Sequence, residues 1–224
     1  AGPHRLPARL AEIQGSGKPT LVRVPSAYPE GYSEKYAGPE VAAEWYDPEL
    51  AKELIKEAGY DPDAGNKPKV YIDSPNQYFG NEKDVAETIA IMLEEVGFET
   101  ELNVLDRSAY FEQVDEPGFN RDVLLVTLGG GPSLVPLFYT CDWWESTYHV
   151  CDEEWDAVSK AILTTVDPDE RLALWEQWWE HYLDYAHTVT LYEIMNTYAM
   201  NDDFDWTPRA DGWMTFRDLK LAEE

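Results

Sequence analysis

Apolar side chains recur every three or four positions in several parts of the chain, which is the spacing of amphipathic helices. In the first such part, Asp47 is suited to an N-cap, Pro48 to the first helical position and Gly59 to a left-handed exit. The same spacing predicts further helices that begin at Asn81, Asp106, Asp152 and Asp167 and end near Gly97, Phe111, Leu163 and Ala186.

Short runs of β-branched, aromatic and aliphatic residues between these helices predict strands. Residues 69–73 and 99–104 flank one helix, and this order of strand, helix and strand predicts a parallel pair with a right-handed crossover. Residues 122–127 are almost continuously apolar, as in a central strand covered on both faces. Weaker signals predict strands at 20–24, 188–192 and 198–200. The predicted fold class is therefore α/β, a mixed sheet with helices on both faces.

Prolines and glycines interrupt any long period before residue 45. We therefore expect an extended arm or inter-lobe segment at 1–45 and a ligand-binding α/β lobe at 46–224. The sequence Gly-Ser-Gly-Lys at 15–18 imitates part of a phosphate-binding loop, but it lacks the full spacing, a preceding strand and a following apolar helix. A flexible arm is the preferred interpretation of that stretch.

The charge balance excludes one class of partner. The chain has 44 Asp and Glu against 17 Lys and Arg, a net charge of −27. Such a surface repels phosphate backbones, so we expect no nucleic-acid partner. A solubilising surface suited to a salty habitat is preferred over attraction of cationic ligands. No stretch is apolar for long enough to span a bilayer, and nothing in the sequence predicts a cofactor.

The two cysteines, Cys141 and Cys151, lie close together in an aromatic, loop-rich segment. They are either free thiols or a disulfide formed in an oxidising compartment, and the disulfide is slightly preferred. His149 lies between them, but this arrangement matches no zinc pattern, so no metal site is predicted.

Polar and aromatic residues follow the carboxyl ends of the predicted strands, where ligands usually bind in α/β proteins. Serine and asparagine there could hydrogen-bond a ligand, although they also serve in turns. Successive glycines expose backbone groups to a ligand, or form only a tight exit turn. Tryptophans after the turn could stack on a ligand face, or pack beneath the loop. The candidate ligand-binding residues are Ser74, Asn76, Tyr78, Thr127, Gly129, Gly130, Gly131, Ser133, Trp143 and Trp144.

An enzyme is the main rival class. Paired carboxylates beside tryptophans suggest a glycoside hydrolase, but with 44 acidic residues such pairs arise by chance. The sequence contains no nucleophile elbow, P-loop or metalloprotease motif. We therefore expect no catalytic activity and assign no catalytic residue. A purely structural module is a third class, and it would lack a cleft.

Several segments carry a resemblance to a known family, and they occur in the family's order. They are residues 46–60, 84–98, 119–131, 154–158 and 167–175. Together they resemble the second lobe of extracytoplasmic solute-binding proteins of family 5, the oligopeptide-, dipeptide- and nickel-binding components of ABC importers. The resemblance covers about residues 40–222 and implies a periplasmic binding protein-like lobe of the class C type.

This resemblance implies a function in transport. Members of the family close a ligand between two lobes and deliver it to a membrane permease. We therefore expect a small-molecule or oligopeptide ligand, an ABC permease as partner, a missing N-terminal lobe, and a periplasmic or extracellular, membrane-associated location. Peptide-binding members place an Asp after the glycine-rich turn, whereas residues 127–133 contain no acid. That difference keeps an oligosaccharide open as the ligand, while a nickel chelate is a weaker alternative.

Overall fold

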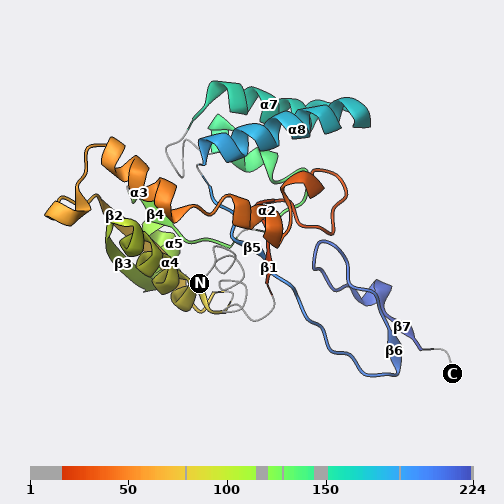
Figure 1. Ribbon diagram of the computed structural model, residues 1–224. Coiled ribbons are helices and arrows are strands. Elements are labelled where there is room, and N and C mark those ends of the chain that lie inside the picture. Colours follow the sequence, from red (N-terminus) through yellow and green to blue (C-terminus); the bar gives the residue numbers. More distant parts are fainter. Residues whose placement is uncertain are drawn as a thin grey trace.

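A parallel three-stranded sheet forms one half of the molecule (Figure 1). The computed structural model describes residues 17–78, 80–114, 121–127, 129–143, 151–186 and 188–222. The strands β2 (Lys69–Asn76), β3 (Glu99–Asp106) and β4 (Val123–Leu124) lie in the order β3-β2-β4, and both pairs are parallel. The predicted α/β fold class and the predicted strand–helix–strand unit are therefore confirmed.

Two helices connect these strands. The helix α4 (Glu82–Val96) joins β2 to β3, and α5 (Arg107–Val114) follows β3; both pack on the sheet. The connection from β2 to β3 runs in one direction along the sheet, and the connection from β3 to β4 runs in the opposite direction, past β2. Right-handed crossovers in opposite directions place their helices on opposite faces of a sheet. On one face, Asp73 accepts a hydrogen bond from the Gln113 side chain of α5 at 2.8 Å.

The strand β4 is shorter than the predicted run 122–127. The Tyr71 backbone N–H donates to the Asp122 carboxylate at 2.8 Å. In a longer strand, a backbone carbonyl of β4 would accept this hydrogen bond instead. Regular pairing consequently begins only at Val123. Beyond the strand, the Leu125 N–H still donates to the Asp73 carbonyl at 2.9 Å before the chain leaves the sheet.

A buried ion pair ties β2 to the segment that precedes β4. Asp73 is 1% exposed, and its Oδ2 lies 3.0 Å from the Arg121 Nε. The other carboxylate oxygen, Oδ1, has no hydrogen-bond partner among the described residues. Because an unpaired buried carboxylate is costly, Arg121 is the residue that makes Asp73 tolerable at this depth.

Helix starts follow the sequence closely. Asp47 caps α3 (Pro48–Glu57) by accepting the N–H groups of Glu49 and Leu50 at 3.1 and 3.0 Å. Asp152 and Asp167 cap α7 (Glu153–Thr164) and α8 (Pro168–Tyr185) in the same way. These predicted starts are confirmed, because an acidic N-cap satisfies amide groups that have no partner within the helix.

The remaining elements of the described ranges are short. They are α2 (Pro39–Glu44), the 3-10 turns Glu34–Tyr36, Pro62–Ala64, Pro136–Tyr139 and Phe216–Asp218, and four two-residue strands. The strands β1 (Lys18–Pro19) and β5 (Tyr192–Glu193) pair antiparallel, as do β6 (Phe204–Asp205) and β7 (Lys220–Leu221).

The predicted strands at 20–24 and 198–200 are absent, and of 188–192 only Tyr192 lies in a strand. At the first position, the Thr20 hydroxyl accepts the Val22 N–H at 3.0 Å, a local bond that competes with ladder formation. The stretch 198–200 lies in a segment without strand pairing that ends where β6 meets β7.

The second half of the molecule is built around tryptophans on α7 and α8, which lie side by side away from the sheet (Figure 1). The core contains Val22, Val24, Val135, Tyr139, Trp155, Ile162, Trp175, Trp178, Trp179 and Tyr182, all less than 4% exposed. Two of the buried indole N–H groups donate to identified acceptors: Trp178 to the Ser159 hydroxyl at 3.0 Å and Trp179 to the Gly31 carbonyl at 2.9 Å. Val22 and Val24 precede the predicted boundary at residue 45 yet belong to this core, while the boundary itself stays a prediction.

In the described part of the chain, each helix is too short or too polar to cross a membrane.

Candidate functional site

Several predicted ligand-binding residues follow β2 and β4 along the chain, past the carboxyl edge of the parallel sheet. Asn76, at the end of β2, lies opposite Asp106, at the end of β3. Asp73 of β2 pairs with Leu124 of β4, and the two strands are parallel. The chain therefore leaves β4 at the same edge of the sheet. Residues that follow β2 and residues that follow β4 are therefore neighbours, although about 50 positions separate them in the sequence.

An aromatic ring and a cation meet at this edge. The half-buried Tyr78 ring makes an edge-to-face contact with Phe111 of α5 at 5.3 Å between centroids. The Arg107 guanidinium lies 4.5 Å from the centre of the Tyr78 ring. Arg107 is exposed, so it carries positive charge to the surface beside Tyr78 and the exposed Asn76. Sequence reasoning missed Arg107, although its place directly after a strand was a usable signal.

Ser74 faces inward. It is fully buried, and its hydroxyl donates to the Pro75 carbonyl at 3.0 Å. We therefore leave Ser74 out of the contact surface proposed below.

The glycine-rich turn contains two kinds of glycine. A Cβ on Gly131 would lie 3.0 Å from the Tyr28 ring, so the missing side chain allows close packing there. A Cβ on Gly129 would meet nothing within 4 Å, and Gly129 is exposed. Gly131 thus has a packing role, whereas Gly129 presents open backbone at the sheet edge, with Thr127 half-buried before it and Ser133 exposed after it.

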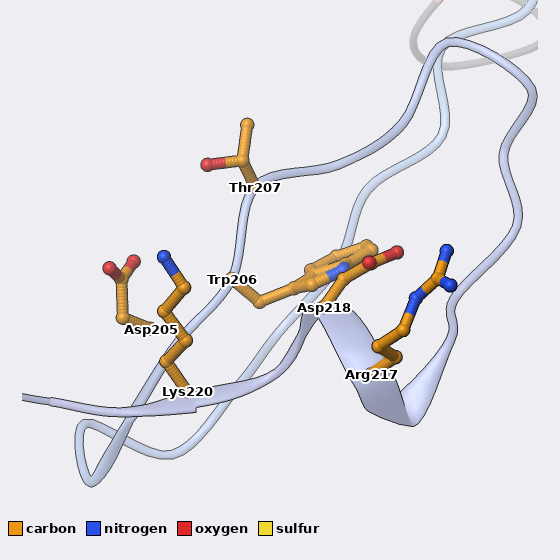
Figure 2. Close-up of a pocket in the computed structure, with 6 residues that line it drawn as sticks. All are labelled: Asp205, Trp206, Thr207, Arg217, Asp218 and Lys220. Carbon is orange, nitrogen blue, oxygen red and sulfur yellow. The ribbon is translucent and has the colours of Figure 1, made fainter.

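An open pocket of about 310 Å³ lies elsewhere, on the β6–β7 hairpin (Figure 2). Its lining mixes both signs of charge around an indole ring and contains Asp205, Trp206, Thr207, Arg217, Asp218 and Lys220. None of the predicted ligand-binding residues that the structure describes lines it.

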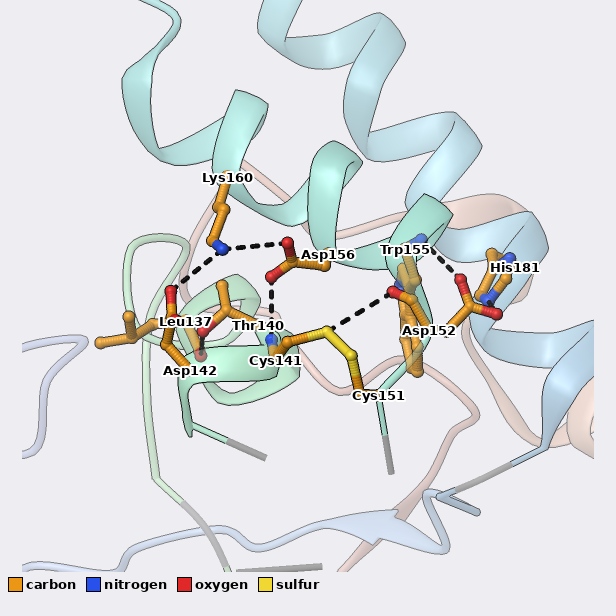
Figure 3. The surroundings of a disulfide bond; sticks show 10 residues. All are labelled: Leu137, Thr140, Cys141, Asp142, Cys151, Asp152, Trp155, Asp156, Lys160 and His181. Carbon is orange, nitrogen blue, oxygen red and sulfur yellow. Dashed lines mark hydrogen bonds and ion pairs between the residues drawn. A yellow bond between two sulfur atoms is a disulfide. The ribbon is translucent and has the colours of Figure 1, made fainter. Parts of the chain in front are cut away.

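A disulfide joins Cys141 to Cys151, with Cα atoms 4.9 Å apart (Figure 3). The Cys141 N–H donates to the Asp156 carboxylate at 2.8 Å, and Lys160 bridges Asp156 and Asp142 at 2.9 and 3.0 Å. These contacts fix the start of the aromatic loop against the first turns of α7.

Trp143 is 44% exposed and makes an edge-to-face contact with Phe138 at 5.3 Å between centroids. Behind it, Arg23 lies 5.4 Å from the Phe138 ring centre and donates through Nε to the Tyr139 hydroxyl at 3.2 Å. Trp143 is thus a partly exposed ring packed edge-to-face on Phe138, which in turn contacts Arg23. The predicted Trp144 lies outside the described residues. No local signal pointed to Arg23, because its partners are more than 100 positions away.

Burial perturbs two tyrosines near these features. Burial and then the nearby Glu82 carboxylate raise the pKa of Tyr192 to about 12. Burial also raises the pKa of Tyr182 well above its usual range. Both phenols are therefore neutral at physiological pH and act as hydrogen-bonding or packing groups. Within the ranges that the structure describes, no group of three His, Cys, Asp or Glu side chains is placed to hold a metal ion.

The fold is that of a periplasmic binding protein lobe. The ABC transporter substrate-binding protein CtaP from Listeria monocytogenes superposes with a TM-score of 0.71 at 19% identity, over 98% of this chain and 45% of that one. Haemophilus influenzae OppA in complex with the peptide RPPGFSPFR gives 0.74 at 16% identity, over 97% and 43%. The Escherichia coli murein tripeptide binding protein MppA gives 0.70 at 16% identity, over 100% and 47%. The chain spans less than half the length of these proteins.

The family follows from the sequence match. Residues 11–149 match the bacterial extracellular solute-binding proteins, family 5 Middle. This is more than half of the 224 residues, so the chain belongs to that family, and the resemblance seen in the sequence is confirmed. Among curated protein sequences, none matches the chain.

Proposed function

We propose that this chain is the ligand-capturing lobe of an ABC importer's substrate-binding component, and that its ligand is an oligopeptide. Family membership carries the proposal, because it rests on a match over more than half the chain. Two proteins of the same fold are described as binding peptides, Haemophilus influenzae OppA and Escherichia coli MppA. In this role the protein works outside the cytoplasm, needs a second lobe to enclose the ligand, and hands it to a membrane permease without chemical change.

The sheet edge suits a peptide in several ways. The open backbone at Gly129 can exchange hydrogen bonds with peptide N–H and C=O groups. Arg107, which lies over Tyr78, supplies positive charge for a carboxylate in an otherwise acidic protein. Residues 127–133 offer no carboxylate for a peptide amine, so recognition of that amine falls to another part of the site. The proposed contact residues are Asn76, Tyr78, Thr127, Gly129, Gly130, Ser133, Trp143 and Trp144.

An oligosaccharide is the second candidate ligand. The observation that favours it is the partial exposure of the Trp143 ring, which packs edge-to-face on Phe138. Aromatic faces of this kind bind flat, apolar ligand surfaces, and a pyranose ring presents one. A nickel chelate ranks below both, since the described residues provide no cluster of metal ligands.

A thermal-shift screen of the two-lobe protein against short peptides, oligosaccharides and nickel chelates tests the proposal. A ligand at a hundred times its Kd adds about 2.7 kcal/mol to the stability, which is a readily visible shift. A shift with peptides alone supports an oligopeptide ligand, and a shift with oligosaccharides alone replaces it. Flat curves from a protein that melts cooperatively would overturn the capture role.

Two tryptophan variants show where the ligand binds. Trp143→Ala removes the open ring at the proposed site, and we expect it to weaken binding by about 1–2 kcal/mol, roughly 5- to 30-fold in Kd. Trp45→Ala is the matched control, because Trp45 is 54% exposed, follows α2 and is not among the proposed contact residues. Equal affinities of the two variants would remove Trp143 from the site.

A further inference from the structure

Lys160 joins two carboxylates at the start of the aromatic loop (Figure 3). Its ammonium lies 2.9 Å from Asp156, one turn earlier on α7, and 3.0 Å from Asp142, which belongs to the loop. Hydrogen bonds to Asp156 and then to Asp142 raise the pKa of Lys160, so its ammonium is charged at physiological pH. Lys160 therefore connects the helix to the loop through a single charge.

The two carboxylates differ in how firmly they are held. Asp156 is half-buried, and its second oxygen accepts the Cys141 N–H at 2.8 Å. The Asp142 side chain is 83% exposed, and its printed contact is with Lys160. Both carboxylates approach the same ammonium, so they would repel each other if that charge were removed. Lys160 thus holds an exposed acid of the loop against a fixed acid of the helix.

Trp143 directly follows Asp142 in the chain. Its N–H donates to the Thr140 carbonyl at 3.0 Å, and its ring packs on Phe138 with 5.3 Å between centroids. Residues 141–143 form a helical turn just after the 3-10 turn Pro136–Tyr139. The place of the indole therefore depends on how this turn is attached to the lobe.

Three links tie the turn to α7 and to the residue that precedes it. The disulfide to Cys151 and the hydrogen bond to Asp156 both act at Cys141, two positions before the indole. The Lys160 contact acts at Asp142, the residue next to the indole. A segment held at one point can still rotate about that point, and a second attachment removes this freedom. Of the three links, the Lys160 contact is the one nearest to the ring.

We propose that Lys160 is a positioning residue of the ligand site, which sets the place of the Trp143 ring by holding Asp142 against α7. The inference rests on the function proposed above, in which Trp143 contacts the ligand. Lys160 acts through its neighbours and does not itself bind the ligand. Because exposed ion pairs add little to stability, its effect falls on where the ring lies and not on whether the lobe folds.

Fluorine NMR of the two-lobe protein labelled with fluorotryptophan follows the ring without a ligand. The resonance of Trp143 is the one that disappears in Trp143→Phe. Lys160→Met should displace this resonance and leave those of Trp175 and Trp179 in place. Lys160→Arg should restore it, since a guanidinium can hold both carboxylates. An unchanged Trp143 resonance in Lys160→Met overturns the inference.

Lys52→Met is the matched control. Lys52 also pairs with a carboxylate one turn away, Glu49 at 2.7 Å, and its side chain is 42% exposed against 46% for Lys160. The control should leave the Trp143 resonance unchanged, and both methionine variants should melt close to the unmodified protein. If Lys160→Met melts far below Lys52→Met and moves the resonances of the core tryptophans as well, Lys160 has a general structural role and the inference is overturned.

Calorimetry with the nonapeptide RPPGFSPFR, the ligand in the OppA complex, measures the effect on binding. Lys160→Met should weaken binding by the two-lobe protein about three- to tenfold in Kd. In the Trp143→Ala background the same substitution should have no further effect, because both changes act on one contact. Equal weakening in both backgrounds overturns the inference.

The two proposals fail in different ways. A two-lobe protein that binds neither this nonapeptide nor any other ligand of the screen overturns the proposed function, while the Trp143 resonance still decides whether Lys160 positions the ring. A protein that binds the nonapeptide, and whose Trp143 resonance is the same with and without Lys160, overturns the inference alone.

Discussion

Gly31 is the most sharply constrained backbone position in the tryptophan core. Its φ is +78°, and a Cβ there would lie 2.8 Å from two atoms of the Trp175 ring. The Gly31 carbonyl also accepts the indole N–H of Trp179 at 2.9 Å. Gly31→Ala therefore imposes two costs: a left-handed conformation with a side chain, and a collision with a ring that is 1% exposed and cannot move freely.

The magnitude can be worked from these two costs. The left-handed conformation costs an alanine about 1 kcal/mol, and overpacking a well-filled core costs about 1–3 kcal/mol. We expect Gly31→Ala to lower the free energy of unfolding by about 2–4 kcal/mol. Urea unfolding followed by circular dichroism measures this as a lower midpoint with an unchanged m-value.

A matched glycine isolates the packing cost. Gly59 has a φ of +90°, but a Cβ there would meet nothing within 4 Å. Gly59→Ala should therefore cost only the conformational share, about 1 kcal/mol. If both substitutions lower the stability by the same amount, within about 0.5 kcal/mol, then contact with Trp175 does not constrain Gly31 and the reasoning is refuted.

Three further predictions concern charge and the disulfide. Arg121→Met should cost about 2–3 kcal/mol in chemical unfolding, because it leaves the buried Asp73 charge without a counter-ion and with Gln113 as its remaining hydrogen-bond donor. The double variant Asp73→Asn/Arg121→Met should recover at least half of the loss, and no recovery would contradict the ion-pair argument. The Cys141–Cys151 disulfide joins residues 10 positions apart, and its reduction should lower the free energy of unfolding by about 2–3 kcal/mol, as measured by thermal unfolding with and without reductant. Two alkylatable thiols in the untreated protein would mean that the bond is absent. Raising the salt concentration from about 0.1 to 1 M shortens the screening length from about 10 to 3 Å, which weakens the repulsion within a chain of net charge −27. The melting temperature should therefore rise, and an unchanged melting temperature would show that self-repulsion is unimportant.

The local parts of the fold could be predicted from the sequence. Asp47, Asp152 and Asp167 cap their helices through bonds to the next few amides, so the signal and its structural result lie within one turn. The parallel pair of β2 and β3 followed from the order of a strand, a helix and a strand.

Features that depend on distant partners could not be predicted. The Asp122 carboxylate shortens β4 by bonding across the sheet to Tyr71. The apolar stripe predicted on α3 is only partly buried, because Leu50 and Leu54 are half exposed. Trp178 is fully buried beside Trp175 and Trp179, since tertiary packing covers α8 on more than one side.

The candidate site also contains features that could be predicted from the sequence and features that could not. The position of Asn76 at the carboxyl end of β2 was predictable, because the strand and its direction followed from the order of strand, helix and strand. The inward turn of Ser74 and the stacking of Arg107 on Tyr78 were not, since both depend on the three-dimensional path of the chain after β2.

The clustering of tryptophans gives the protein a built-in optical signal. The rings of Trp155, Trp175, Trp178 and Trp179 lie within 4.9–6.1 Å of a neighbouring ring and are almost completely shielded from water. Indoles this close couple electronically, so the near-ultraviolet circular dichroism should be strong and the fluorescence emission blue-shifted. Trp143, in contrast, emits from a half-exposed loop. If the ligand binds at Trp143, as proposed above, difference spectra should report the binding against the constant signal of the core, without any attached dye.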